Sequence, residues 1–246
     1  MFISVQRMLS QLGIRKLCSR FVPRFLTAEM RAARKAACRQ NLDTFVHSGR
    51  ASMANIITMD ETSLSLYTPE SKRESAEWKL PGEKPSKKLK CAKTSKKCLM
   101  LSVFWKQTGV IKMDFTGDNI NAAYYCQLLE DVRRTQRKPR NDNLWIQHDN
   151  APVHTAHQTI EKMAGLDLHA VAHPPYSPDL APSDFYLFNR LKKHLRGTRF
   201  DSPQDLRLAT EEFFANLDDN FFQTAFQELV QRWRKCYDAD GDYIEK

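Results

Sequence analysis

Three absences limit what this protein can be. The sequence has no run of about 18 apolar residues that would span a membrane. Its first residues also lack the long apolar stretch and the small-residue cleavage site of a secretory signal peptide. These absences predict an intracellular protein with no membrane partner.

Several common motifs of enzymes and small folded domains are also missing. The sequence contains neither GxxxxGK[ST] nor GxGxxG for nucleotide phosphates, and it has no GxSxG for a serine nucleophile. Its six cysteines are scattered, with no CxxC pair, which counts against a zinc finger and a disulfide framework. The cysteines are therefore predicted to be reduced, as in a cytosolic or nuclear protein.

The chain is strongly basic and long enough for a folded domain. Lys and Arg total 38 against 29 Asp and Glu, so the net charge is +9 and the pI is near 9.3. This excess suits a polyanionic partner, and charge alone does not separate a nucleic acid from an acidic membrane surface. With 246 residues, 41% of them hydrophobic, the chain can form one sizeable core and a smaller appendage.

The first 26 residues are predicted to be part of a helix-turn-helix. Two short helical patterns in Val5–Phe25 flank the turn Leu12-Gly13, and Pro23 ends the second. Such a unit places its second helix in the DNA major groove, although it normally needs a third helix to close its core. The basic residues of the second helix are the DNA-binding candidates: Arg15, Lys16 and Arg20. The alternative is a basic amphipathic helix with no role in DNA binding.

Residues 27–54 are predicted to form a linker helix that packs on the core. Thr27 is a suitable N-cap, and apolar residues recur at helical spacing up to Ser48. Gly49 is placed to end the helix. The helix would connect the N-terminal segment to the strands that follow.

Strand patterns begin at residue 55. The run Ile56–Met59 ends at the acidic pair Asp60-Glu61, and two further runs, Leu99–Trp105 and Val110–Phe115, predict a hairpin. Between them lies a loop, residues 69–97, that is broken by prolines and rich in lysine. Its lysines after Pro81 are Lys84, Lys87, Lys88, Lys90, Lys93, Lys96 and Lys97. A loop of this length is either functional or a solvated insertion.

Helices and short strands alternate in the rest of the chain. The expected elements are a helix at Asn121–Arg134, a strand at Leu144–Gln147, a helix at Thr155–Met163 and a strand at Leu166–Val171. The proline-rich run 173–182 is an irregular connector, and helix resumes at Ser183, whose side chain can cap it. Two more helices are expected after Ser202-Pro203. This order predicts an α/β fold in which helices flank a mixed sheet.

Three aspartates stand at the ends of these predicted elements. Asp60 closes the first strand, Asp149 follows the strand that ends at Gln147, and Asp184 lies in the first turn of the helix after the connector. Phosphodiester cleavage needs the phosphate charge neutralised and an oxygen nucleophile activated, and carboxylates bind the hard divalent cations that do both. Each aspartate alone has a structural alternative, because aspartate also caps helices.

A zinc site is the competing hypothesis. Five histidines cluster in sequence around Asp149, namely His148, His154, His157, His169 and His173. His154 and His157 could ligate zinc together with a carboxylate, although their spacing matches none of the usual zinc motifs. The other histidines are expected at the surface or beside the carboxylates.

Two segments around these aspartates resemble a known family. Residues 148–154 read HDNAPVH, and residues 173–188 read HPPYSPDLAPSDFYLF. Both are similar to the signature segments of mariner transposases in the Tc1/mariner superfamily. The 34 residues between Asp149 and Asp184 match the spacing of the mariner catalytic triad, and Asp60 falls where that family has its first aspartate. The resemblance extends over essentially the whole chain.

The resemblance implies an RNase H-like catalytic domain over residues 55–246. It implies two Mg²⁺ or Mn²⁺ ions, with Asp60 and Asp149 as shared ligands and Asp184 completing the site. The neighbouring residues expected to support these ligands are Glu61, Asn150 and His154. Water would attack the phosphate at the transposon end, and the freed 3′-hydroxyl would then attack target DNA at a TA dinucleotide.

The same resemblance implies partners and leaves two alternatives open. The loop 69–97 would be a clamp that reaches a second subunit and DNA in a homodimer, with Lys87, Lys88 and Lys90 as its DNA-binding candidates. The DNA partners would be transposon inverted repeats and the TA target, in the nucleus. Mariner proteins carry paired helix-turn-helix units, and this chain is expected to begin inside the second one. The alternatives are a degenerate or domesticated copy that binds DNA without completing transposition, and a general nuclease of RNase H type.

Overall fold

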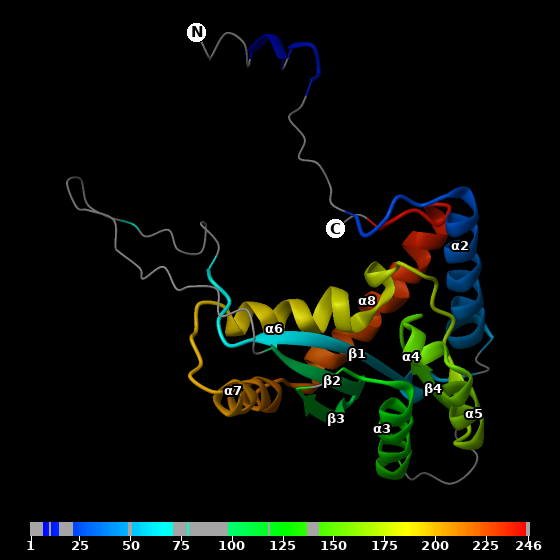
Figure 1. The fold of residues 1–246 in the computed structure, drawn as a ribbon. Coiled ribbons are helices and arrows are strands. Elements are labelled where there is room, and N and C mark those ends of the chain that lie inside the picture. The colour runs from blue at the N-terminus through cyan, green and yellow to red at the C-terminus, as the bar shows by residue number, and fades with distance from the viewer. Residues whose placement is uncertain are drawn as a thin grey trace.

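A mixed five-stranded sheet forms the centre of the protein (Figure 1). The computed structural model describes residues 7–9, 11–14, 22–48, 51–70, 78, 98–117, 119–136 and 143–244. The strands lie in the order β3-β2-β1-β4-β5. Their bounds are Ile56–Ser65 for β1, Cys98–Lys106 for β2, Gly109–Thr116 for β3, Leu144–Gln147 for β4 and Leu168–Ala170 for β5. β1, β2 and β3 pair antiparallel, whereas β4 pairs parallel with β1 and β5 pairs parallel with β4.

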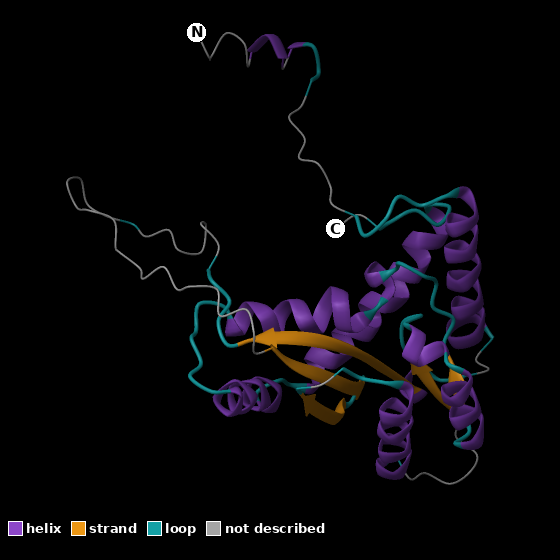
Figure 2. Ribbon diagram, viewed as in Figure 1, coloured by secondary structure: helices purple, strands orange, loops and turns teal. Residues whose placement is uncertain are grey.

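Helices cover both faces of this sheet, as Figure 2 shows. One face packs against α3 (Ala122–Thr135) and α5 (His157–Gly165), which follows the short helix α4 (Pro152–Thr155). The other face packs against α6 (Phe188–Leu195), α7 (Pro203–Ala215), α8 (Asp219–Asp238) and α2 (Ala28–Leu42), the last of which lies along α8. The described residues also form short helical turns, among them η2 (Met53–Asn55), η3 (Pro178–Leu180) and the π-helical η4 (Ser183–Leu187). The predicted α/β architecture is confirmed.

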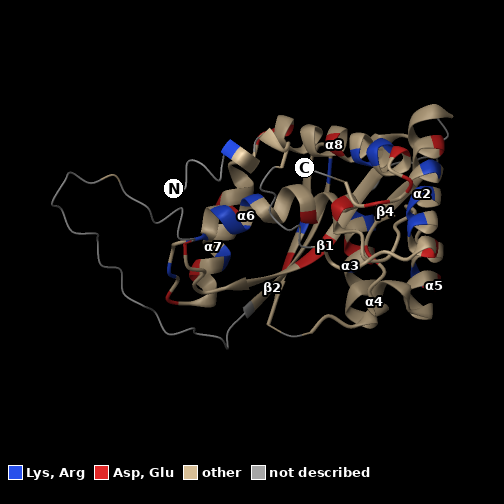
Figure 3. Ribbon diagram, turned by 90° about the horizontal axis from the view of Figure 1, so that it is seen from above, with Lys and Arg blue, Asp and Glu red and all other residues tan. Residues whose placement is uncertain are grey.

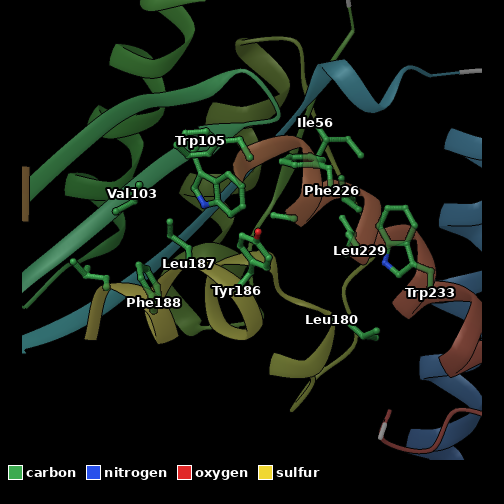
Figure 4. Close-up of a cluster of buried hydrophobic side chains, with 14 of the residues drawn as sticks. Ile56, Val103, Trp105, Leu180, Tyr186, Leu187, Phe188, Phe226, Leu229 and Trp233 are labelled. Atoms are coloured by element: carbon green, nitrogen blue, oxygen red, sulfur yellow. The ribbon is translucent and has the colours of Figure 1, made fainter. Parts of the chain in front are cut away.

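Strand alternation divides the apolar side chains between the two layers. In β1, Ile56 packs into the cluster beneath α6 and α8, whereas Ile57 and Met59 pack against α3 and α5. β2 divides in the same way, with Trp105 in the first cluster and Phe104 in the second. This period of two is expected for strands that are buried on both faces. Figure 4 shows Trp105 lying among Tyr186, Leu187 and Phe226 in the larger cluster.

The predicted linker helix is present and belongs to the core. α2 begins after Thr27, whose hydroxyl accepts a hydrogen bond from the Met30 amide, and it continues into the π-helical turn η1 (Asp43–His47). Cys38 and Phe45 are buried against the rest of the domain. Burial of this face explains how a helix of low average hydrophobicity is held in place.

Part of the N-terminal prediction lies outside the described residues. Residues 7–9 and 11 are helical, and Gly13 has a φ of 68°, a conformation suited to glycine that supports the turn predicted at Leu12-Gly13. The helix predicted after this turn, with Arg15, Lys16 and Arg20, is not among the described residues. Most of the lysine-rich loop 69–97, including Lys87, Lys88 and Lys90, is also outside them.

Three local predictions are wrong. β1 runs five residues past Asp60, because Thr58–Ser65 pairs with β2 over its whole length. The helix predicted from Thr155 is broken, because Ala156 is extended and separates α4 from α5. Ser183 does not cap the helix that follows, because its hydroxyl accepts a hydrogen bond from Trp105. Within the described ranges, no helix is long and apolar enough to cross a membrane.

Candidate active site

The register of two parallel strands brings Asp60 and Asp149 together. Thr58 of β1 lies beside Gln147 at the carboxyl end of β4. Two residues further along each chain, Asp60 continues in β1 and Asp149 enters the loop that leaves β4. Asp60 shares the face of Ile56, which is the face covered by η4 and α6. The two carboxylates therefore lie near each other at the point where β4 ends and the neighbouring strand β1 continues.

A hydrogen bond from the sheet fixes the start of the third element. Trp105 lies beside Thr58 in the β1–β2 pair, and its indole Nε1 donates to the Ser183 hydroxyl at 3.0 Å. Ser183 is fully buried and directly precedes Asp184 in η4. The Gln147 amide Nε2 also donates to the Leu180 carbonyl at 2.9 Å, which holds the preceding connector against β4. These two contacts bring the third carboxylate to the first two.

Electrostatic coupling follows from this arrangement. Burial raises the pKa of Asp60 well above its usual range, and the charges of Asp184, Glu61 and Asp149 raise it further. Burial likewise raises the pKa of Asp184 to about 6, with a contribution from Asp149 that the positive charge of Lys192 opposes. The charges of Asp149 and Asp184 thus both act on Asp60, and the charge of Asp149 also acts on Asp184. The three predicted aspartates therefore interact electrostatically.

His154 joins two acidic residues that approach it from different elements. Its Nδ1 lies 2.8 Å from Asp149 Oδ1, and its Nε2 lies 3.2 Å from Glu61 Oε1. Burial alone would lower the pKa of His154, but the hydrogen bonds to Asp149 and Glu61 outweigh it and raise this pKa to about 9. The bond from His154 lowers the pKa of Asp149 in turn. A charged His154 therefore fixes the Asp149 side chain and links it to β1.

Aromatic rings support His154 from behind. Tyr125 of α3 and His148 pack against its ring, with centroid distances of 4.5 and 4.9 Å, and the Tyr125 hydroxyl lies 2.9 Å from His148 Nδ1. Burial lowers the pKa of His148 to about 3, so this ring stays neutral beside the charged one. Sequence reasoning missed Tyr125, because its position indicates only the buried face of a helix. A cavity of about 660 Å³ opens next to this group, lined by Asp149, His154 and apolar residues of α5 and β5.

The remaining site candidates have different surroundings. Asn150 donates from Nδ2 to the His173 carbonyl at 2.8 Å, so it attaches the loop after β4 to the proline-rich connector. The exposed His157 ring lies 3.3 Å from Glu161, one turn further along α5. The zinc hypothesis based on His154 and His157 fails here, because their rings have separate partners.

The oxygen donors fit a hard divalent cation. Mg²⁺ prefers carboxylate oxygens and is held by one or two of them together with water and substrate oxygens. Among the residues that the structure describes, no three His, Cys, Asp and Glu side chains are grouped so that they alone could hold a metal ion. Zinc requires three or four protein ligands, whereas an open carboxylate cluster suits an ion that substrate phosphate helps to bind.

Fold and carboxylate cluster together define a class of protein, the metal-dependent enzymes that break and join phosphodiester bonds. A family model described as DDE superfamily endonuclease matches residues 55–207. The mariner Mos1 transposase of Drosophila mauritiana is 32% identical over 250 residues, which are 98% of this chain and 71% of that protein. The histone-lysine N-methyltransferase SETMAR of Homo sapiens is 31% identical over 249 residues, which are 98% of this chain and 36% of that protein.

Solved structures agree with these sequence relatives. The Mos1 transposase paired-end complex with left transposon end has a TM-score of 0.85 at 32% identity and covers 98% of this chain and 71% of its own. Mos1 paired-end complexes with Mn and with Mg have TM-scores of 0.84 and 0.85, with the same identity and coverage.

This chain belongs to the DDE superfamily endonucleases and, within them, to the mariner transposases. Its mixed sheet is the RNase H-like fold of that family. It is the catalytic region of a DNA transposase, an enzyme that uses divalent metal for strand cleavage and strand transfer.

Proposed function

We propose that Asp60, Asp149 and Asp184 hold two divalent ions, Mg²⁺ or Mn²⁺, for cleavage and strand transfer of transposon DNA. The observation that supports this proposal is the parallel register of β1 and β4, in which Thr58 lies beside Gln147 two residues before Asp60 and Asp149, together with the effect of the Asp184 charge on Asp60. Ions bound there would neutralise charge on the scissile phosphate and activate the attacking oxygen. Asp60 and Asp149 would be shared ligands, and Asp184 would complete the site.

Other residues of the chain would keep this geometry fixed during the reaction. His154 holds one Asp149 oxygen by a hydrogen bond, which leaves the second Asp149 oxygen to act as a ligand. Asn150 holds the loop after β4 to the connector through the His173 carbonyl. In cleavage, water oxygen bonds to phosphorus as the P–O3′ bond breaks; in transfer, a 3′-hydroxyl replaces the water. No covalent bond between protein and DNA is required.

The DNA substrates would be transposon inverted repeats and a TA target. An excess of nine positive charges suits a DNA-binding enzyme. One solved paired-end complex of Mos1 contains the left transposon end, which supports DNA ends as the substrate here. A protein with these substrates would act in the nucleus.

The proposed division of the chain follows from the same family. Residues 55–246 would form the catalytic domain, 27–54 the linker helix and 1–26 part of a helix-turn-helix with Arg15, Lys16 and Arg20 as DNA contacts. The loop 69–97 would clamp a second subunit in a homodimer and contact DNA through Lys87, Lys88 and Lys90. Deleting this loop and measuring mass by sedimentation tests the clamp, since loss of a dimer is expected.

A cleavage assay with matched variants tests the metal site. Supercoiled plasmid and a duplex carrying inverted repeats are incubated with the protein in Mg²⁺, Mn²⁺ or Ca²⁺, and nicked product is measured. Asp184→Asn and Asp149→Asn should abolish nicking. Asp219→Asn is the control and should retain nicking, because Asp219 lies in the first turn of α8 and is not one of the three proposed ligands. If Mn²⁺ gives no nicking above the Asp149→Asn background, the proposed activity is rejected.

A further inference from the structure

The exposed face of α6 carries positive charge directly after Asp184. Phe188, Leu191 and Leu195 are the buried side chains of this helix, so Asn189, Lys192 and Lys193 lie on the opposite face and are exposed. The helix contains no acidic residue. Figure 3 shows the Lys and Arg positions of α6 in blue.

One contact ties this face to the candidate site. Asn189 donates from Nδ2 to the Asp184 carbonyl at 2.8 Å, so the exposed face of α6 begins above the third aspartate. Lys192 and Lys193 follow Asn189 by three and four residues, which places them on the same face one turn further on. The two lysines therefore extend outward from the carboxylate cluster.

The two lysines differ from several other cations on the described surface. Lys35, Lys112 and Lys162 each lie within 2.7 Å of a carboxylate oxygen. Arg190, on the same helix, donates to the Tyr186 carbonyl and stacks on the Tyr186 ring. Among the described residues, neither Lys192 nor Lys193 has a hydrogen bond or an ion pair with a carboxylate. Their ammonium groups are free to bind an anion.

We propose that Lys192 and Lys193 bind backbone phosphates of the DNA strand that enters the carboxylate site. This inference rests on the proposed function, because it assumes DNA as the substrate. Eight helical residues span roughly 12 Å at 1.5 Å per residue. At 3.4 Å per phosphate along each strand, Lys192 lies about three or four phosphates from the bond at Asp184. Lysine contacts at this distance set the position of the strand without reading its sequence.

Lys192 and Lys193 could instead serve only to stabilise α6, and the experiment has to distinguish this structural role from DNA binding. Cations in the last turn of a helix stabilise it by interacting with the helix dipole, and both lysines lie in the last turn of α6. Arg133 and Arg134 occupy the last turn of α3, which covers the other face of the sheet. The double variant Arg133→Gln/Arg134→Gln therefore removes two charges from the last turn of a helix on the other face of the sheet, where Arg134 is ion-paired with Asp131 at 3.5 Å.

The experiment measures the affinity of the full chain for a duplex in Ca²⁺ at several salt concentrations. For Lys192→Gln/Lys193→Gln, the slope of log affinity against log salt should fall by about two, and the arginine control should keep the wild-type slope. Lys192→Arg/Lys193→Arg should also keep it. Thermal melting of each variant checks folding, and the arginine-for-lysine variant gives an independent result if the glutamine variant unfolds.

Two outcomes would overturn the inference in distinguishable ways. An unchanged slope in Lys192→Gln/Lys193→Gln, beside a steep wild-type slope, would reject the role of α6 and leave the proposed function standing. Failure of the wild-type chain to bind DNA at any salt concentration would reject both. A loss of affinity shared equally by the α3 control would show a general charge effect and would also reject the role of α6.

Discussion

The indole of Trp105 donates a hydrogen bond of 3.0 Å to the hydroxyl of Ser183, and both side chains are buried. Trp105 belongs to the central sheet, whereas Ser183 begins the turn that carries Asp184. The bond therefore connects the central sheet to the turn that carries Asp184, the last of the three aspartates along the chain. It predicts that stability and activity are linked at this position.

Removing both partners of this bond should lower the free energy of unfolding by less than the two single removals added together. Trp105→Phe and Ser183→Ala are each expected to lower the free energy of unfolding by about 1–3 kcal/mol, because each leaves a buried polar group unpaired. The double variant should lose less than the sum of the two. Urea unfolding of the four proteins measures this coupling. Strictly additive losses would contradict the proposed link.

Arg34 should be among the most sensitive residues of α2. Its guanidinium is fully buried and makes two hydrogen bonds to Asp179, of 2.9 and 2.7 Å, besides one to Ser177. Arg34→Ala leaves the Asp179 carboxylate without its buried partner, and we expect a loss of about 3–5 kcal/mol in the free energy of unfolding. Arg34→Lys should restore only part of this lost free energy, because lysine does not form the bidentate contact with Asp179.

The neighbouring residue provides the control for Arg34. Lys35 also forms an ion pair, with Asp240 at 2.5 Å, but this pair is exposed to solvent. Lys35→Ala should change the unfolding midpoint little, because exposed ion pairs contribute little to stability. Equal effects of the two substitutions in denaturant titrations would show that burial does not decide the contribution of Arg34.

Gly241 should tolerate no side chain. It has a φ of 81°, and an added Cβ would lie 2.0 Å from the Arg31 carbonyl oxygen of α2. Gly241→Ala is expected to cost at least about 1 kcal/mol and to release the segment 241–244 from Arg34, which donates to the Gly241 carbonyl. Faster amide hydrogen exchange in α2 would report this release. Gly117→Ala is the control, because nothing lies within 4 Å of its added Cβ.

His154 should act on metal affinity through Asp149. Replacing a residue that orients a metal ligand typically costs 10–100-fold in affinity, and we expect a loss of about this size for His154→Ala. Isothermal titration with Mn²⁺ measures it without requiring catalysis. The exposed His157→Ala is the matched control and should bind Mn²⁺ like the wild type. Weaker binding by both variants would instead support a histidine-based metal site.

The sequence was a good guide where local patterns decide structure. β4 has the predicted bounds Leu144–Gln147, and the hairpin of β2 and β3 and the helix capped by Asn121 are present as expected. Asp149 and Asp184 could be found because long motifs surround them. The position of Asp60 within β1 could not, because it depends on pairing with β2, a strand separated from it by more than 30 residues of chain.

Contacts between distant segments explain the other differences. Ser183 has the composition of a helix cap, but Trp105 takes its hydroxyl, and this contact joins positions 78 residues apart. His154 was expected near the carboxylates, yet its bond to Glu61 arises only when α4 lies beside β1, 93 residues away in sequence. The role inferred for Lys192 depends on which face of α6 is buried. Tertiary packing sets each of these, and no local pattern encodes it.

The bonds of Arg34 also affect the order in which the chain can fold during synthesis. Arg34 lies 207 residues before Gly241, whose carbonyl accepts its Nε hydrogen bond, and 145 residues before Asp179. At about 5–20 residues per second, a ribosome needs roughly 10–40 s to travel from Arg34 to Gly241. During that time the guanidinium remains hydrated and α2 lacks its final partners. Nascent chains should therefore stay sensitive to proteases at α2 until Gly241 has left the ribosome, and then become protected in a single step.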